Sequence, residues 1–107
     1  MQYLLIINTT DAETVWNALR FGSSSLSRGH QVNVFLLGKA VEIENIGDEK
    51  FDVQPLLARF DELGGVALSC GTCLRLREMD ASAVCPMSTM DDLVRLTEEA
   101  ERVLTFG

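Results

Sequence analysis

The sequence predicts an α/β domain in which strands and helices alternate along the chain. The continuous apolar run at residues 3–7 is typical of a strand buried on both faces, and residues 31–37, rich in Val, Phe and Leu, are expected to form the second strand. Segments with helical periodicity follow them. This alternation favours a three-layer sandwich, a mainly parallel sheet with helices on both faces. Because the chain has 107 residues, we expect a single domain over 1–107.

The first helix is expected to begin near Thr10. Thr10 and Glu13 have the spacing of a capping box, in which a hydroxyl and a carboxylate satisfy the first backbone N–H groups. Val15 and Leu19 then recur at helical spacing, and Gly29 supplies the stop.

The middle of the chain predicts a turn, a loop, a helix and a strand. Gly38 ends the second strand, residues 39–42 favour one helical turn, and the acidic segment 42–52 is expected to be a surface loop. Apolar residues at i, i+3, i+4 and i+7 predict an amphipathic helix over 53–63. The third strand is expected at 66–69.

The last third of the chain predicts two further strands around a helix. Residues 83–85 are expected to form a short fourth strand that Pro86 ends. Ser88 or Thr89 can cap the last helix, and the β-prone residues 102–106 are expected to close the sheet.

The acidic balance of the chain disfavours two classes of partner. The formal net charge is −7, from 16 acidic and 9 basic residues, which is the wrong sign for binding nucleic acid or an anionic membrane surface. No apolar run reaches the ~18 residues of a membrane span. The N-terminal residues lack the features of a secretory signal, so we expect a cytoplasmic protein.

Cys70 and Cys73 are the residues best suited to chemistry. They form a C-x-x-C motif, with Gly71 and Thr72 between them, where a buried strand is expected to give way to a helix. Backbone N–H groups and the dipole at such a junction favour a nucleophilic thiolate. The alternative is that both cysteines are small buried hydrophobes.

The third cysteine, Cys85, has two equally well supported roles. It can lie near Cys70 at the same sheet edge and act as a resolving thiol, or it can be a buried cysteine in a strand. A zinc site is disfavoured, because only Cys85 and His30 are left to complete four ligands. No dinucleotide or P-loop motif is present, so no cofactor is expected.

These residues resemble the DsrE/TusD-type sulfur-relay superfamily, and most of all its small YchN-like members. The opening strand followed by Asn8 and Thr9 fits this family, as does the closing segment. The motifs that carry the resemblance are Cys70-Gly71-Thr72-Cys73-Leu74 with Arg77, and Ser88-Thr89-Met90-Asp91-Asp92-Leu93.

The resemblance implies a five-stranded, mainly parallel sheet and assembly into trimers or hexamers. It also implies that Cys70 carries a persulfide, receiving sulfur from a donor protein and handing it to an acceptor, with Cys73 as an extra cysteine of the YchN-like subgroup. Gly71, Thr72, Arg77, Asn8 and Thr9 become supporting site residues. The sequence departs from the family where Arg77-Glu78 replaces the frequent Arg-Gly.

Three functions follow in order of preference. The first is a sulfur carrier in which Cys70 accepts a sulfane sulfur. The second is a thioredoxin-like dithiol oxidoreductase in which Cys70 attacks and Cys73 resolves. The third is a non-catalytic oligomeric scaffold or regulatory subunit with structural cysteines.

Overall fold

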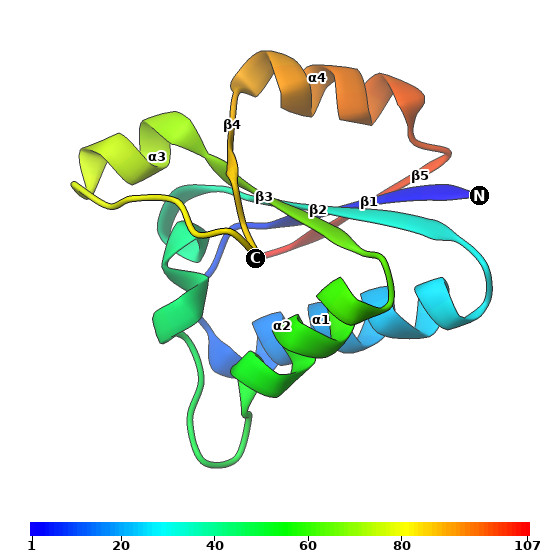
Figure 1. Ribbon diagram of the computed structural model, residues 1–107, viewed down its shortest axis with the longest axis horizontal. Helices are drawn as coiled ribbons and strands as arrows, with labels where there is room; N and C mark the ends of the chain where they lie inside the picture. The colour runs from blue at the N-terminus through cyan, green and yellow to red at the C-terminus, as the bar shows by residue number, and fades with distance from the viewer.

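The sheet is five-stranded and every strand pairing in it is parallel. The computed structural model describes all residues 1–107 (Figure 1). The strand order is β4-β3-β2-β1-β5, which confirms the predicted parallel α/β sheet. The strands are β1 (Gln2–Ile7), β2 (Gln31–Leu36), β3 (Val66–Cys70), β4 (Met87–Ser88) and β5 (Arg102–Phe106).

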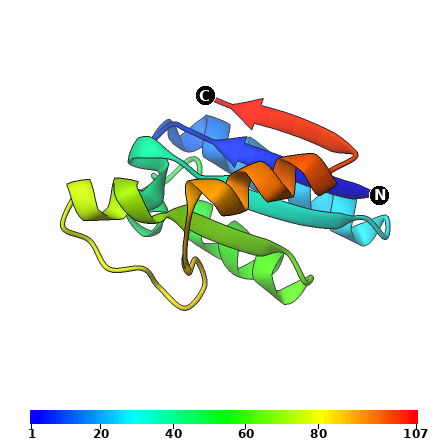
Figure 2. The same cartoon turned by 90° about the horizontal axis from the view of Figure 1, so that it is seen from above.

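Helices cover both faces of this sheet. Figure 1 shows α1 (Ala12–Ser27) and α2 (Val53–Glu62) on one face and α4 (Met90–Glu99) on the other, and Figure 2 shows α4 lying along the strands. The 3₁₀ helix η1 (Gly38–Asn45) and α3 (Gly71–Leu76) extend from the carboxyl ends of β2 and β3. The expected three layers are confirmed, and no helix combines the length and apolar character needed to cross a bilayer.

The central strands form the core because their side chains are buried on both faces. Leu4 and Leu5 of β1 have no exposed surface, and neither do Val34 and Phe35 of β2. Successive side chains of a strand point to opposite faces, so each strand contributes to both helical layers. The uninterrupted apolar run of β1 and the largely apolar sequence of β2 are therefore explained by helices on both sides of the sheet.

The two helices on one face meet around Phe60 of α2. A Cβ atom on Gly22 of α1 would lie 2.8 Å from the Phe60 ring, and one on Gly65 would lie 2.4 Å from it. The two glycines therefore provide the space that the ring fills.

Two local expectations differ from the structure near the first and second strands. The prediction that Thr10 opens the capping box is wrong, because Asp11 is the N-cap and accepts a 2.9 Å hydrogen bond from the Thr14 N–H. The loop expected from Glu42 begins later, since η1 continues to Asn45.

The predicted strand at 83–85 is also wrong, because the strand follows Pro86 instead of preceding it. The Ser69 N–H donates to the Pro86 carbonyl at 2.9 Å, and the register then pairs Cys70 with Ser88. Proline lacks an N–H but keeps a carbonyl acceptor, so it can begin an edge strand. This short strand, β4, brings Ser88 beside Cys70.

We predict that Gly65→Ala destabilises the fold by about 1–3 kcal/mol, because the new methyl group overlaps the Phe60 ring. Urea unfolding of wild type and variant measures the cost. In a Phe60→Leu background the cost should shrink, since the two sites share one contact. An equal cost in both backgrounds would show that the ring is not the obstacle.

Candidate functional site

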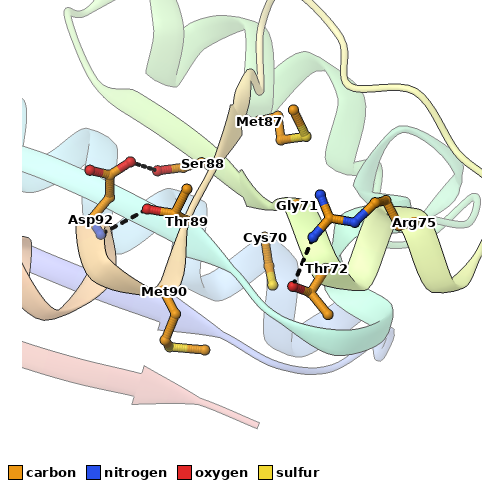
Figure 3. Close-up of a pocket in the computed structure, with 9 residues that line it drawn as sticks. All are labelled: Cys70, Gly71, Thr72, Arg75, Met87, Ser88, Thr89, Met90 and Asp92. Carbon is orange, nitrogen blue, oxygen red and sulfur yellow. Dashed lines mark hydrogen bonds between the residues drawn. The ribbon is translucent and has the colours of Figure 1, made fainter.

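Cys70 is nearly buried, yet it lines an open cavity at the carboxyl end of β3. The residue is 3% exposed and caps the N-terminus of α3. The cavity has a volume of about 240 Å³ (Figure 3). Its other walls come from α3, through Gly71, Thr72 and Arg75, and from β4 and the start of α4, through Met87, Ser88, Thr89, Met90 and Asp92.

Gly71 allows the junction of β3 and α3 to lie close to β4. A Cβ atom at this position would lie 3.0 Å from Cγ of Met87 and 3.1 Å from the Ser88 carbonyl oxygen. Such contacts are tighter than ordinary van der Waals packing, so a larger residue would push β4 away. The glycine of the C-x-x-C motif therefore shapes the cavity wall.

The environment of Cys70 favours the neutral thiol. Burial raises the pKa of Cys70 above its ordinary value, and the neighbouring Cys73 side chain adds to the rise. The backbone N–H groups of Thr72 and Cys73 oppose this shift only in part. The expectation that the strand–helix junction holds a thiolate is therefore wrong for the resting protein, since desolvation outweighs the short α3 helix.

Cys73 connects the C-x-x-C motif to the neighbouring strand end. Its Sγ accepts a 3.2 Å hydrogen bond from the backbone N–H of Gly38, which follows β2. Gly38 has a φ of +56°, and a Cβ there would lie 2.6 Å from Oδ1 of Asn8, so glycine is required on both counts. Asn8 thus lies beside Gly38, on the Cys73 side of the motif.

The remaining predicted supporting residues also lie outside the Cys70 cavity. Oγ1 of Thr9 accepts a hydrogen bond from the Asp11 N–H at 3.1 Å and so helps to begin α1. Arg77 donates to the Cys73 carbonyl at 3.1 Å and lies 3.7 Å from the Glu42 carboxylate. Arg77 therefore holds α3 against η1, and it is not a wall of the cavity.

Cys85 lies in a different cavity from Cys70. It lines a small space of about 40 Å³ together with Ser69 and Leu74. Ser69 and Cys70 are consecutive in β3, so their side chains point to opposite faces of the sheet. The structure therefore does not bring Cys85 and Cys70 into one cavity.

A hydroxyl and a carboxylate that are hydrogen-bonded to each other in the cavity were not among the predicted site residues. The Ser88 hydroxyl donates to Oδ2 of Asp92 at 2.7 Å, and both residues line the cavity. This hydrogen bond is the main reason that the pKa of Asp92 lies below its ordinary value, so the carboxylate is ionised at neutral pH. Both residues belong to the motif Ser88-Thr89-Met90-Asp91-Asp92-Leu93 that carries the family resemblance, but only their i, i+4 spacing indicates that they form a pair.

Comparisons with known proteins match the chain to one family model and to two archaeal relatives. Residues 1–106 match the model of the DsrE/DsrF-like family. The protein MJ0989 of Methanocaldococcus jannaschii is 33% identical, with 99% of this chain and 100% of that protein covered. The protein MK0008 of Methanopyrus kandleri is 32% identical over 88% of this chain and 83% of its own length.

A solved structure shares the fold. The crystal structure of the YchN protein from E. coli superimposes with a TM-score of 0.84 and covers 99% of this chain and 100% of that one. At 24% sequence identity, this likeness supports the architecture alone.

We predict a pH-dependent contribution of Cys85 to stability. Burial, and then the Glu44 charge, raise the pKa of Cys85 to about 11 from an ordinary value of 9.0. Between these two values the unfolded thiol has lost its proton and the folded thiol keeps it, so folding stability falls as pH rises.

The test compares the free energy of unfolding of wild type and Cys85→Ala from pH 8 to pH 11. Wild type should lose stability more steeply than the variant between about pH 9 and pH 11, and the two slopes should match below pH 9. Parallel slopes over the whole range would show that Cys85 does not titrate in this way.

Proposed function

Because the chain belongs to the DsrE/DsrF-like family, we propose that it is a sulfur carrier in which Cys70 accepts a sulfane sulfur and passes it on. The observation that carries the proposal is the place of Cys70, at the carboxyl end of β3 and in the wall of an open cavity. Open parallel sheets bind ligands at the carboxyl ends of their strands. Gly71 and Thr72 support the proposal, since they share this cavity with the thiol.

The transfer is a thiol exchange that conserves sulfur oxidation states. The Cys70 sulfur attacks the terminal sulfur of a donor persulfide, a new S–S bond forms and the S–S bond of the donor breaks. The donor leaves as a thiol that takes the proton of Cys70, and Cys70 becomes a persulfide. Because the resting thiol is neutral, deprotonation must accompany the attack.

Arg77, Asn8 and Thr9 have supporting places in the proposed carrier. Arg77 and the Gly38 segment beside Asn8 both hold Cys73, by way of its carbonyl and its sulfur. Thr9 fixes the turn into α1 at the same edge of the sheet. Substitutions here are expected to act through the position of the C-x-x-C motif.

A second candidate function uses Cys70 and Cys73 as a redox pair. The influence of the Cys73 side chain on the Cys70 pKa supports it, because it requires the two side chains to be neighbours. Attack of Cys73 on a Cys70 persulfide would form the Cys70–Cys73 disulfide and release hydrogen sulfide. Cys73 would then be a resolving thiol, as in a dithiol oxidoreductase.

We further propose that the carrier is a homo-oligomer, a trimer or hexamer, that works in the cytoplasm and passes its sulfur on to an acceptor protein. The large exposed apolar side chains support association. Leu76 is 78% exposed, and Met87, Met90 and Val94 each expose more than half of their surface. Met87 and Met90 both border the Cys70 cavity, and apolar side chains that gather in an exposed patch are typical of protein–protein contacts.

We predict that a sulfane-sulfur donor adds sulfur to wild type and that Cys70→Ser abolishes this gain. The protein is incubated with inorganic polysulfide, and its intact mass is recorded with peptide mapping of the added sulfur. Cys85→Ser is the matched control, since its side chain lines the other cavity, and it should load like wild type.

Cys73→Ser separates the two candidates. A carrier should hold the persulfide equally in wild type and in Cys73→Ser. A redox pair should form the Cys70–Cys73 disulfide and release hydrogen sulfide in wild type, and should keep the persulfide only in Cys73→Ser. Equal sulfur gain by Cys70→Ser and wild type would contradict the carrier. If native Cys70 and Cys73 resist both polysulfide and iodoacetamide, the scaffold hypothesis is favoured.

A further inference from the structure

Two opposite charges flank Cys70 in its cavity. Figure 3 shows Asp92, at the start of α4, and Arg75, on α3, on opposite sides of the thiol. The sulfur lies between an anionic and a cationic wall. Arg75 can stabilise the thiolate that forms as Cys70 attacks, but a carboxylate on the other side of the sulfur opposes that ionisation. The pair of opposite charges therefore calls for a separate explanation.

Each charged side chain is held in place by a neighbouring hydroxyl. The Ser88 hydroxyl donates to Asp92 at 2.7 Å, and Arg75 donates to Oγ1 of Thr72 at 3.3 Å. Arg95 lies 3.6 Å from the other Asp92 oxygen, but both side chains are about half exposed, and surface pairs of this kind bind weakly. The carboxylate and guanidinium therefore remain free to bind a ligand that carries the complementary charges.

The size of the cavity restricts the ligand. At about 240 Å³ it is smaller than the roughly 300–1,000 Å³ of sites that take drug-sized molecules. An amino acid is small enough, and its ammonium, carboxylate and side chain diverge from one carbon in three directions. These three groups match an anionic wall, a cationic wall and a reactive sulfur.

We propose that the cavity recognises a free amino-acid persulfide, cysteine persulfide, with its ammonium group bound by Asp92 and its carboxylate by Arg75. This inference rests on the proposed sulfur carrier and names its donor class. Cys70 attacks the terminal sulfur, the S–S bond of the donor breaks, and free cysteine leaves with the proton of Cys70. Cys70 keeps the transferred sulfur as a persulfide, so atoms and electrons balance.

A persulfide within a protein chain would not use the two charges in this way. Its amino and carboxyl groups are tied up in peptide bonds, so it offers neither an ammonium ion nor a carboxylate at that carbon. Asp92 would then keep only its contacts with Ser88 and Arg95, and Arg75 only its contact with Thr72. The two charged walls thus distinguish a free amino acid from a peptide-bound donor.

The test ranks four disulfide probes by their rate of attack by Cys70, in a Cys73→Ser background that traps each adduct. Cystine carries both the ammonium and the carboxylate group, and cystamine carries only the ammonium group. The other two probes are 3,3′-dithiodipropionic acid, which carries only the carboxylate, and the disulfide of N-acetylcysteinamide, which carries neither charge. Intact mass identifies the adduct. Cystine should react at least about tenfold faster than the uncharged probe, as expected for two charge-assisted hydrogen bonds.

Two variants that remove one charge each show which side chain binds which charged group of the probes. Asp92→Asn should slow cystine and cystamine but not the dianionic probe, and Arg75→Gln should slow cystine and the dianionic probe but not cystamine. Asp91→Asn and Arg102→Gln are the matched controls, because neither residue lines the cavity, and they should leave the ranking unchanged.

The outcomes separate this inference from the function on which it rests. Equal rates for all four probes, or a fastest reaction with the uncharged probe, would overturn amino-acid recognition and leave the carrier standing. This ranking needs no substitution in the charged walls, so it decides the question even if a variant fails to fold. If Cys70 attacks no probe and gains no sulfur from polysulfide, the carrier and its proposed donor both fail.

Discussion

The parallel pairing of β3 with the two-residue strand β4 is the constraint on which the site depends. The hydrogen bond from the Ser69 N–H to the Pro86 carbonyl fixes the register that pairs Cys70 with Ser88. Residues paired in this way point to the same face, so the thiol and the hydroxyl that holds Asp92 share one cavity. Gly71 permits the close approach, because any side chain there would meet Met87 and the Ser88 carbonyl.

Burial of Cys70 has two opposing effects on its reactivity. Cys70 must be buried enough for its surroundings to orient it, but burial and Cys73 favour the uncharged thiol. The thiol is protected at rest and is expected to ionise only when a sulfur electrophile arrives. Cys85 lies apart, on the other face of β3, where burial keeps it protonated.

The sequence predicts helices and strands correctly where many consecutive residues repeat one hydrophobic pattern. The apolar runs of β1 and β2 and the helical period of α2 identify their elements, because both faces of the sheet and one face of the helix are buried. β4 was not predicted because a strand of two residues is too short to show a hydrophobic period. Pro86 was interpreted as the end of a strand, whereas it directly precedes one. Gly71 and Thr72 were predicted for the site, but the charged walls of the cavity were missed for a different reason. Arg75 and Asp92 are far apart in the chain, and only the β3–β4 register brings their elements together. The raised pKa of Cys70 depends on burial, which its local motif does not report.

A crystal structure of the protein after reaction with inorganic polysulfide would show directly whether Cys70 carries sulfur. One additional sulfur atom should be bonded to Sγ of Cys70, lying in the cavity between Thr72 and Ser88, with Cys85 unmodified. Additional sulfur on Cys73 or Cys85 with an unchanged Cys70, or an unmodified protein with an empty cavity, would contradict the proposed sulfur carrier.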